Sequence, residues 1–219
     1  MDHRYRFPFA YCGLLLLMLS PHGFSDEAGQ QLAQQGGEGI PACASCHGAK
    51  GEGNAAAGWP HLAGLPADYL ASQLKAFANG SRDNATMAPI ASALSDQQRE
   101  AVAGYFAGLA PPDSAPSKAV AGKVRERGKT LAQYGDWQKG IPACTTCHGL
   151  QGRGVGATFP PIAGQSATYL QNQIKAWQSG QRNNDPNGLM AAVAKRLDEK
   201  DIQAVTAWFA SLPPQPSAQ

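Results

Sequence analysis

Large apolar residues recur at helical spacing in two stretches of the chain, and both stretches return about a hundred residues later. Within each stretch these residues lie three or four positions apart, so they share one face of an α-helix. The positions are Tyr69, Leu70, Leu74 and Phe77, then Val102, Tyr105, Phe106 and Leu109, and in the second copy Tyr169, Leu170, Ile174 and Trp177, then Val205, Trp208, Phe209 and Leu212. The pattern predicts helices with one buried face in each of two similar halves.

The ends of these helices carry recognisable signals. Ser95 with Gln98 has the spacing of a capping box, and Asp198 opens the equivalent helix of the second half. Gly80 and Gly180 follow the other pair of helices, where glycine commonly ends a helix. The sequence therefore predicts helices as the main elements of both halves.

One further helix is predicted at the start of each half. Residues 26–35 form a short polar helix candidate, and residues 120–134 form a longer counterpart with a basic face. That face is sparse in charge and has no aromatic platform, so nucleic acid is not expected as a partner. A solvated face and a protein docking patch both fit it.

Between the predicted helices of each half lies a Cys-x-x-Cys-His run, which is the attachment pattern of a c-type haem. Two intervening residues let both sulfurs reach the vinyl groups of one porphyrin, and the next residue offers an imidazole to iron. The run occupies Cys43, Cys46 and His47 in the first half and Cys144, Cys147 and His148 in the second. We therefore expect two covalently bound haem c groups, attached through the four cysteines and ligated by the two histidines.

Three other kinds of site use paired cysteines: a zinc site, a thioredoxin-like redox disulfide and a structural disulfide. A single zinc would have to unite pairs far apart in the chain and would leave both histidines unexplained. The thioredoxin motif needs a βαβ context that the pattern does not show. The five-residue run, present twice in matching surroundings, favours haem.

The sixth iron ligand is predicted from the methionines. Only Met87 and Met190 follow the predicted leader, and they lie 40 and 42 residues after His47 and His148. A lone methionine is usually core filling, but two methionines at matched positions fit two irons. A thioether raises the reduction potential and closes the coordination sphere, so such iron only accepts and passes electrons.

The remaining histidine of the predicted mature chain, His61, aligns with Pro161 and has no counterpart in the second half. We expect it to be a surface or haem-rim residue and not a ligand. Each ligand histidine should donate its outer N–H to a backbone carbonyl, and Pro60 and Pro160 are the candidates.

The first 25 residues have the organisation of a signal peptide. His3, Arg4 and Arg6 precede an apolar run over residues 13–19, and residues 23–25 form a small-x-small cleavage site. The apolar run is too short to span a membrane. Cys12 precedes this run, so it is not a lipidation site. We expect cleavage near Asp26 and a periplasmic location, in agreement with the attachment of haem c outside the cytoplasm.

Charge and composition change this picture little. The full chain has 219 residues, and without residues 1–25 it has 16 basic and 15 acidic residues. Residues 26–110 carry 4 basic against 8 acidic residues, and residues 111–219 carry 12 against 7. This asymmetry fits either a dipole that orients the protein on charged partners or ordinary scatter over solvated faces. No stretch of the mature chain approaches the roughly 20 apolar residues of a transmembrane helix.

The repeat divides the chain. We predict a signal peptide (1–25), a first haem domain (26–110), a Pro-rich linker (111–118), a second haem domain (119–213) and a disordered tail (214–219).

Each half resembles class I cytochrome c, and the whole chain resembles the di-haem cytochrome c4 family. The resemblance rests on the Cys-x-x-Cys-His-Gly run, the Trp/Phe-Pro-x-Leu/Ile-Ala-Gly segment, the distal methionine and the closing helix. It implies two all-α domains related by a pseudo-twofold axis, with haem propionates facing across the interface. It also implies that each haem is bound by two cysteines, a histidine and a methionine of its own half.

By this resemblance the protein is a periplasmic electron carrier and not an enzyme, passing electrons from a quinol-oxidising complex towards a terminal oxidase, with the surface of a membrane complex among its partners. The Gly-Ile-Pro-Ala stretch before both runs departs from the family pattern, so other redox partners stay open. The alternatives are a haem subunit of a periplasmic dehydrogenase and a di-haem peroxidase.

Overall fold

The computed structural model describes residues 22–113 and 122–214, and over these ranges it contains helices and no β-strand. The first half comprises α1 (His22–Gln35), α2 (Ala44–His47), α3 (Ala67–Ala78), α4 (Met87–Ala93) and α5 (Asp96–Gly108). The second comprises α6 (Lys123–Tyr134), α7 (Cys144–His148), α8 (Ala167–Ser179), α9 (Leu189–Ala194) and α10 (Glu199–Ala210), with short 3-10 turns at Leu150–Gly152 and Pro186–Gly188. The all-α prediction is confirmed. Most of the predicted leader, linker and tail lies outside the described residues.

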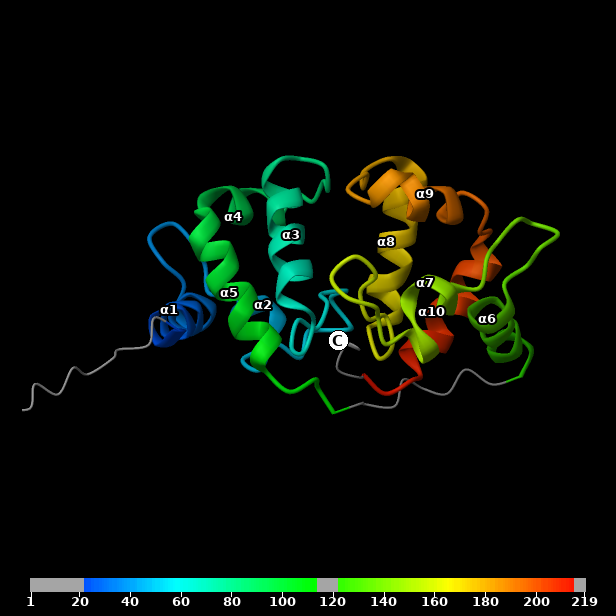
Figure 1. Cartoon of the computed structure of the whole chain (residues 1–219), viewed down its shortest axis with the longest axis horizontal. Helices are drawn as coiled ribbons and strands as arrows, with labels where there is room; N and C mark the ends of the chain where they lie inside the picture. The colour runs from blue at the N-terminus through cyan, green and yellow to red at the C-terminus, as the bar shows by residue number, and fades with distance from the viewer. Residues whose placement is uncertain (1–21, 114–121, 215–219) are drawn as a thin grey trace, which may run out of the picture.

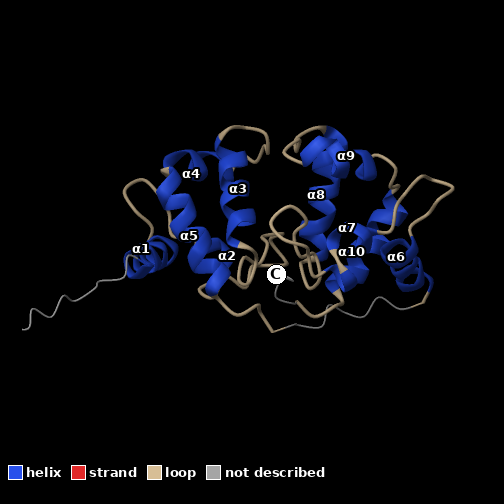
Figure 2. Ribbon diagram, in the orientation of Figure 1, coloured by secondary structure: helices blue, strands red, loops and turns tan. Residues whose placement is uncertain are grey.

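The two halves stand side by side with their third helices innermost. Figure 1 shows α3 and α8 flanking the middle of the molecule, with α1 and α6 at its two ends. The loops that follow α3 and α8 face each other across the middle (Figure 2). They are joined by backbone hydrogen bonds in which Asp83 N–H donates to Gln181 O at 2.7 Å and Asn183 N–H to Ser81 O at 2.8 Å.

The predicted caps are present. Ser95 Oγ accepts from the Gln98 amide at 3.2 Å and Gln98 Oε1 accepts from the Ser95 amide at 2.8 Å, which makes a complete capping box at α5. Asp198 caps α10 through the Asp201 amide at 2.9 Å. Each cap satisfies an amide that the first helical turn leaves unpaired.

The short helices α4 and α9 were not predicted. Neither residue at their N-caps, Thr86 or Gly188, forms a side-chain cap. The capping side chains lie earlier in the chain. Asn84 Oδ1 accepts a hydrogen bond from the Met87 amide at 2.9 Å, and Asp185 Oδ2 accepts one from the Ala191 amide at 2.9 Å. Helix α1 also begins earlier than predicted, at His22, so the helix runs across the predicted cleavage position.

Each half has its own apolar core, closed by its first and last helices. The first core includes Leu32, Leu65, Leu70, Val102 and Phe106, and the second includes Leu131, Ile141, Ile174, Ile202 and Phe209. Helix α1 crosses α5, and α6 crosses α10. A glycine lies at each crossing, where a Cβ on Gly29 or Gly128 would overlap the carbonyl of Ala101 or Ala204. The backbones can approach this closely only because both residues lack a side chain.

We expect Gly128→Ala to destabilise the second half by roughly 1 to 3 kcal/mol, because α6 and α10 must move apart to admit the methyl group. Thermal unfolding of the holoprotein measures this effect. Gly104→Ala is the matched control, since Gly104 lies inside α5 with open space where its Cβ would be. That substitution should raise stability by up to about 1 kcal/mol through helix propensity. Equal effects of the two substitutions would contradict the role of the crossing.

Candidate haem-binding sites

The two Cys-x-x-Cys-His runs form short helices at corresponding places of the two halves. Cys43 lies at the N-cap of α2, which ends at His47, and α7 spans Cys144–His148. All four cysteines are free. No three His, Cys, Asp or Glu side chains gather into a metal-binding group within the described ranges. The structure therefore supports neither the structural disulfide nor the single zinc site.

Each histidine of these runs is oriented by a backbone carbonyl. His47 Nδ1 lies 3.0 Å from Pro60 O, and His148 Nδ1 lies 2.9 Å from Pro160 O. A carbonyl only accepts, so Nδ1 carries the proton and Nε2 keeps the lone pair that an iron would take. Burial lowers the pKa of both imidazoles, which favours the neutral, ligating form. The prediction for Pro60 and Pro160 is confirmed.

Glycines allow the prolines to reach the histidines. Gly53 has φ +79°, and a Cβ there would clash with the Pro60–His61 backbone. Its amide donates to His47 O at 2.7 Å, and the Gly154 amide donates to His148 O at the same distance. These glycines thus allow two segments of the chain to come into close contact.

A cavity of about 440 Å³ lies in the second half and is lined mostly by its residues. Cys144, Cys147, His148 and Met190 all line this cavity, as do apolar side chains including Ile141, Ile162, Leu170, Ile174, Val205 and Phe209. The wall also includes Tyr69 and Gln73 of α3, so the cavity reaches the contact between the halves. Its size and apolar wall suit a flat organic group held in one orientation by a few polar atoms.

In the first half, the corresponding residues occupy equivalent places in the fold. His47 is buried, Cys43 packs against the first core, and the half-buried Met87 begins α4 much as Met190 lies in the first turn of α9. Assignment of His47 with Met87, and of His148 with Met190, as axial pairs remains a prediction.

Two buried arginines, Arg82 and Arg182, lie between the halves, and each is only 5% exposed. Arg82 donates to Tyr169 Oη at 2.8 Å and to Gln173 Oε1 at 2.6 Å, and Arg182 donates to Gln73 Oε1 at 2.9 Å. Neither guanidinium forms an ion pair with a carboxylate in the part of the chain that the structure describes. Burial lowers the pKa of Arg182, and the charge of Arg82 lowers it further.

This arrangement fits haem. A buried cation normally has an anionic partner, and a haem carries two propionate carboxylates. Arg182 lines the cavity of the second half, together with Trp177, whose buried Nε1 has no hydrogen-bond partner among the described residues. The residues present would hold the ring in the apolar part of the cavity and the propionates beside the arginines.

Sequence reasoning missed this arginine pair. The signal was available, because Arg82 and Arg182 occupy matched positions in the repeat, as do Gln73 and Gln173.

His61 is buried, at 5% exposure, so it is not a surface residue, and the other expected position, at the haem rim, stays a prediction. Its backbone joins the halves, since its amide donates to Gln165 Oε1 and its carbonyl accepts from Gln165 Nε2, both at 3.2 Å. Burial lowers the pKa of the His61 imidazole to about 4. The side chain is therefore neutral in the folded protein at neutral pH.

This shift predicts an acid-dependent loss of stability. Above the unfolded-state pKa of about 6.5, His61 is neutral in both states. Between that pH and about 4 the unfolded chain binds a proton that the folded chain does not, so the free energy of unfolding falls by roughly 3 kcal/mol. His61→Leu, which keeps the amide, should remove this component. Denaturant titrations at pH 7 and pH 4 measure it, and parallel losses in variant and wild type would contradict it.

Comparison with known proteins places this geometry among cytochromes. The family profile described as cytochrome c matches residues 27–110 and again residues 125–213. The thiosulfate dehydrogenase electron acceptor of Thiomonas intermedia is 50% identical over 175 residues, which are 80% of this chain and 80% of that protein. Cytochrome c4 of Pseudomonas aeruginosa is 34% identical over 206 residues, which are 90% of this chain and 96% of that protein.

A solved structure shares the arrangement of the two halves. The thiosulfate dehydrogenase of Marichromatium purpuratum matches 85% of this chain with a TM-score of 0.80 and 44% identity. The match covers 40% of that longer protein.

Proposed function

The chain belongs to the cytochrome c family, with two haem c domains in tandem, and from this we propose that it accepts electrons from a thiosulfate-oxidising dehydrogenase outside the cytoplasm. It is a di-haem electron-transfer protein of the cytochrome c4 type, and its partners are redox proteins. We choose this donor because the chain is similar to a thiosulfate dehydrogenase electron acceptor over four fifths of both chains. The similarity to part of a thiosulfate dehydrogenase supports the same choice.

Haem supplies reversible one-electron chemistry at iron when it is bound. In our proposal, Cys43, Cys46, Cys144 and Cys147 hold the two porphyrins covalently. The Nε2 atoms of His47 and His148 and the sulfurs of Met87 and Met190 would be the iron ligands supplied by the chain. The Pro60 and Pro160 carbonyls fix the imidazoles, and the apolar wall of the cavity excludes water. With a histidine and a methionine of the chain on each iron, the haems would supply electron transfer and would leave no iron position for a substrate.

The donor is tested by mixing oxidised holoprotein with a purified thiosulfate dehydrogenase and thiosulfate. We expect both haems to become reduced, at a rate that rises with dehydrogenase concentration. Thiosulfate without the dehydrogenase is the control. Reduction no faster than in this control would remove the dehydrogenase as donor.

The similarity to cytochrome c4 favours a second candidate, a carrier between a quinol-oxidising complex and a terminal oxidase. The two candidates share the site and differ in the donor, so rapid reduction by a quinol-oxidising complex but not by the dehydrogenase would favour this one. The dehydrogenase haem subunit is the third possibility, and co-purification with a catalytic chain would distinguish it. A di-haem peroxidase requires an open iron, which ready binding of carbon monoxide to the reduced protein would reveal.

We also propose export to the periplasm with removal of the first 25 residues. Over residues 22–113 and 122–214, no helix combines the length and apolar character needed to cross a membrane. Mass spectrometry of the purified holoprotein tests the cleavage position. A chain that still begins at Met1 would contradict it.

A further inference from the structure

The loop between α6 and α7 differs from its counterpart in the first half. In both halves it is closed by a pair of backbone hydrogen bonds, between Gly37 and Ile40 in the first and between Asp136 and Ile141 in the second. Two residues lie inside the first closure and four inside the second, so the second loop carries a two-residue insertion. Trp137 lies in this insertion.

Trp137 is the most exposed large apolar side chain in the described part of the molecule, at 81%. Tyr134, at the end of α6, is 68% exposed. An exposed indole leaves apolar surface in contact with water, and binding of a partner would bury it favourably. Trp and Tyr are also enriched among the residues that contribute most to binding at protein interfaces.

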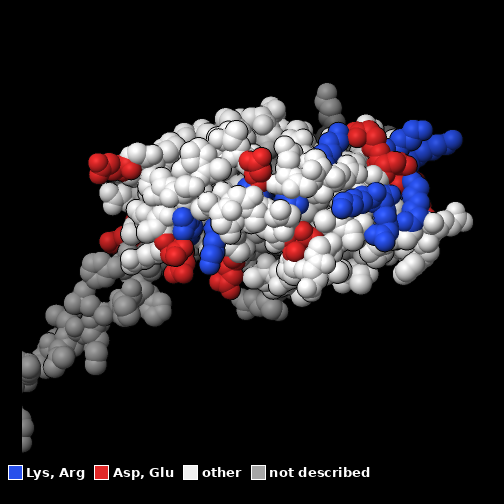
Figure 3. Space-filling view, turned by 90° about the horizontal axis from the view of Figure 1, so that it is seen from above, with Lys and Arg blue, Asp and Glu red and all other residues white. Residues whose placement is uncertain are grey.

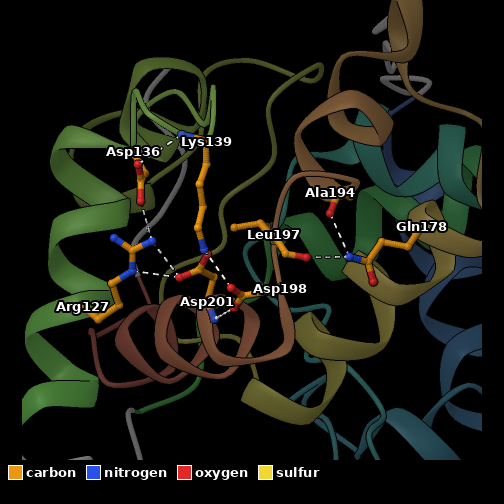
Figure 4. A network of polar contacts seen from close by, with 8 residues as sticks. All are labelled: Arg127, Asp136, Lys139, Gln178, Ala194, Leu197, Asp198 and Asp201. Atoms are coloured by element: carbon orange, nitrogen blue, oxygen red, sulfur yellow. Dashed lines mark hydrogen bonds and ion pairs between the residues drawn. The ribbon is translucent and has the colours of Figure 1, made fainter.

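An ion-pair network holds the loop in place (Figure 4). Arg127 of α6 binds Asp136 at 2.7 Å and Asp201 at 2.8 Å. Lys139 binds Asp198 at 2.7 Å and Asp201 at 2.6 Å. The carboxylate of Asp201 is nearly buried, so it anchors both cations and fixes the loop from either side of Trp137.

The first half folds without this network. Aligned through the glycines at the helix crossings and through the caps, the positions of Arg127, Asp136, Asp198 and Asp201 hold Ala28, Gly37, Ser95 and Gln98. The haem domain fold therefore does not require the network, and its effect is to present Trp137 in one position.

The surroundings of the loop are basic. Lys123, Arg125 and Lys129 are exposed on α6, and the side chain of Arg196 lies against Gly140 of the loop. Gln178 holds the turn that carries Arg196 by donating to Ala194 O and Leu197 O, both at 2.9 Å. Figure 3 shows Lys and Arg side chains gathered, with some Asp and Glu among them, at the end of the molecule formed by the second half.

The loop also leads directly to the second haem site. Ile141, Pro142, Ala143 and Cys144 line the cavity, and Trp137 precedes Ile141 by four residues. Four residues span at most about 14 Å, and this closed turn spans less. A protein seated on Trp137 thus lies beside the second cavity.

We propose that Trp137, Tyr134 and the basic residues of α6 form the docking surface for a redox protein that presents an apolar recess with an acidic rim. The indole is the anchor of this surface, and the exposed cations steer the approach of the partner. Electrons then enter or leave through the second half.

The test compares Trp137→Ala and an Arg125→Glu, Lys129→Glu double variant with wild-type holoprotein. One arm measures the second-order rate of reduction by thiosulfate dehydrogenase with thiosulfate, and this arm rests on the proposed function. The other arm measures the electron-transfer rate at an electrode covered with a mixed carboxylate and methyl monolayer, which does not depend on the donor.

We expect Trp137→Ala to lower both rates at least tenfold and the double variant to lose the dependence on salt, with unchanged reduction potentials and melting temperature. Leu150→Ala, at another side chain of the second half that is 72% exposed, and Lys75→Glu, at an exposed lysine of α3, are the controls and should match wild type.

Wild-type rates for Trp137→Ala in both arms would overturn the docking surface. If the dehydrogenase fails to reduce even the wild type, the proposed donor is wrong, and the electrode arm alone decides the inference. Sedimentation of the wild type as a dimer that Trp137→Ala converts to a monomer would identify a second copy of the chain as the occupant, and would overturn the redox partner.

Discussion

Protein without haem is expected to lose most of its far-ultraviolet helical signal and to melt without a cooperative transition. In the second half alone, an apolar cavity of about 440 Å³ would remain unfilled. Without haem, the apolar side chains of this cavity would face water and lose the packing that the ring provides. The whole stability of a domain is only about 5 to 15 kcal/mol. Domains of this size also bury only a modest fraction of their surface on folding, so their stability without haem is low.

The experiment uses variants in which alanine replaces cysteines of the runs. Replacing all four should give the unfolded chain. Replacing Cys144 and Cys147 alone should leave the first half folded with one haem, as haem content and circular dichroism together report. A native-like, cooperative melt of the haem-free chain would contradict the prediction.

Met190→Ala is expected to open the iron of the second half and to lower its reduction potential by on the order of 0.1 V or more, because the thioether stabilises ferrous iron and axial ligands set the potential over a wide range. The weak far-red band of methionine-ligated ferric haem should lose about half its intensity, and the reduced protein should bind carbon monoxide at one haem. A redox-resolved optical titration measures all three effects.

Two variants complete this experiment. Met87→Ala should do the same to the other haem, so the two variants assign the two potentials. Lys195→Ala is the matched control, because Lys195 is the exposed C-cap residue of α9 and does not line the cavity. An unchanged titration of Met87→Ala or Met190→Ala would remove that methionine from the ligand set.

The sequence predicted the parts of the fold that local rules determine. The apolar stripes and caps of α3, α5, α8 and α10 follow from periodicity and from side-chain chemistry within three or four residues. The same holds for the Pro60 and Pro160 carbonyls, because the repeat set both prolines at a similar distance from the histidines. Helices α4 and α9 were not predicted, because the side chains that cap them, Asn84 and Asp185, lie several residues earlier in polar loops.

Features that depend on contact between the halves could not be predicted. The repeat marks Arg82 and Arg182 as a matched pair, but no local pattern reports that α8 of the other half supplies Tyr169 and Gln173 to Arg82. His61 was expected at the surface or the haem rim, and the contact of its backbone with Gln165, 104 residues away, could not be read from local sequence. The inserted loop with Trp137 changes the register of the repeat, but its rigidity arises from acids on α10 that only the fold brings near.

The contact between the halves is made largely by a seam of buried polar side chains, namely Arg82, Arg182, Gln73 and Gln173, and this affects how strongly the halves associate. Guanidinium and amide groups are hydrated well when apart, so each hydrogen bond across the seam contributes only about 0.5 to 1.5 kcal/mol. The covalent link between the two halves compensates, because it makes their association intramolecular. Proteolytic nicking of that link would turn an intramolecular contact into a bimolecular one, and the two cytochrome modules would drift apart on dilution.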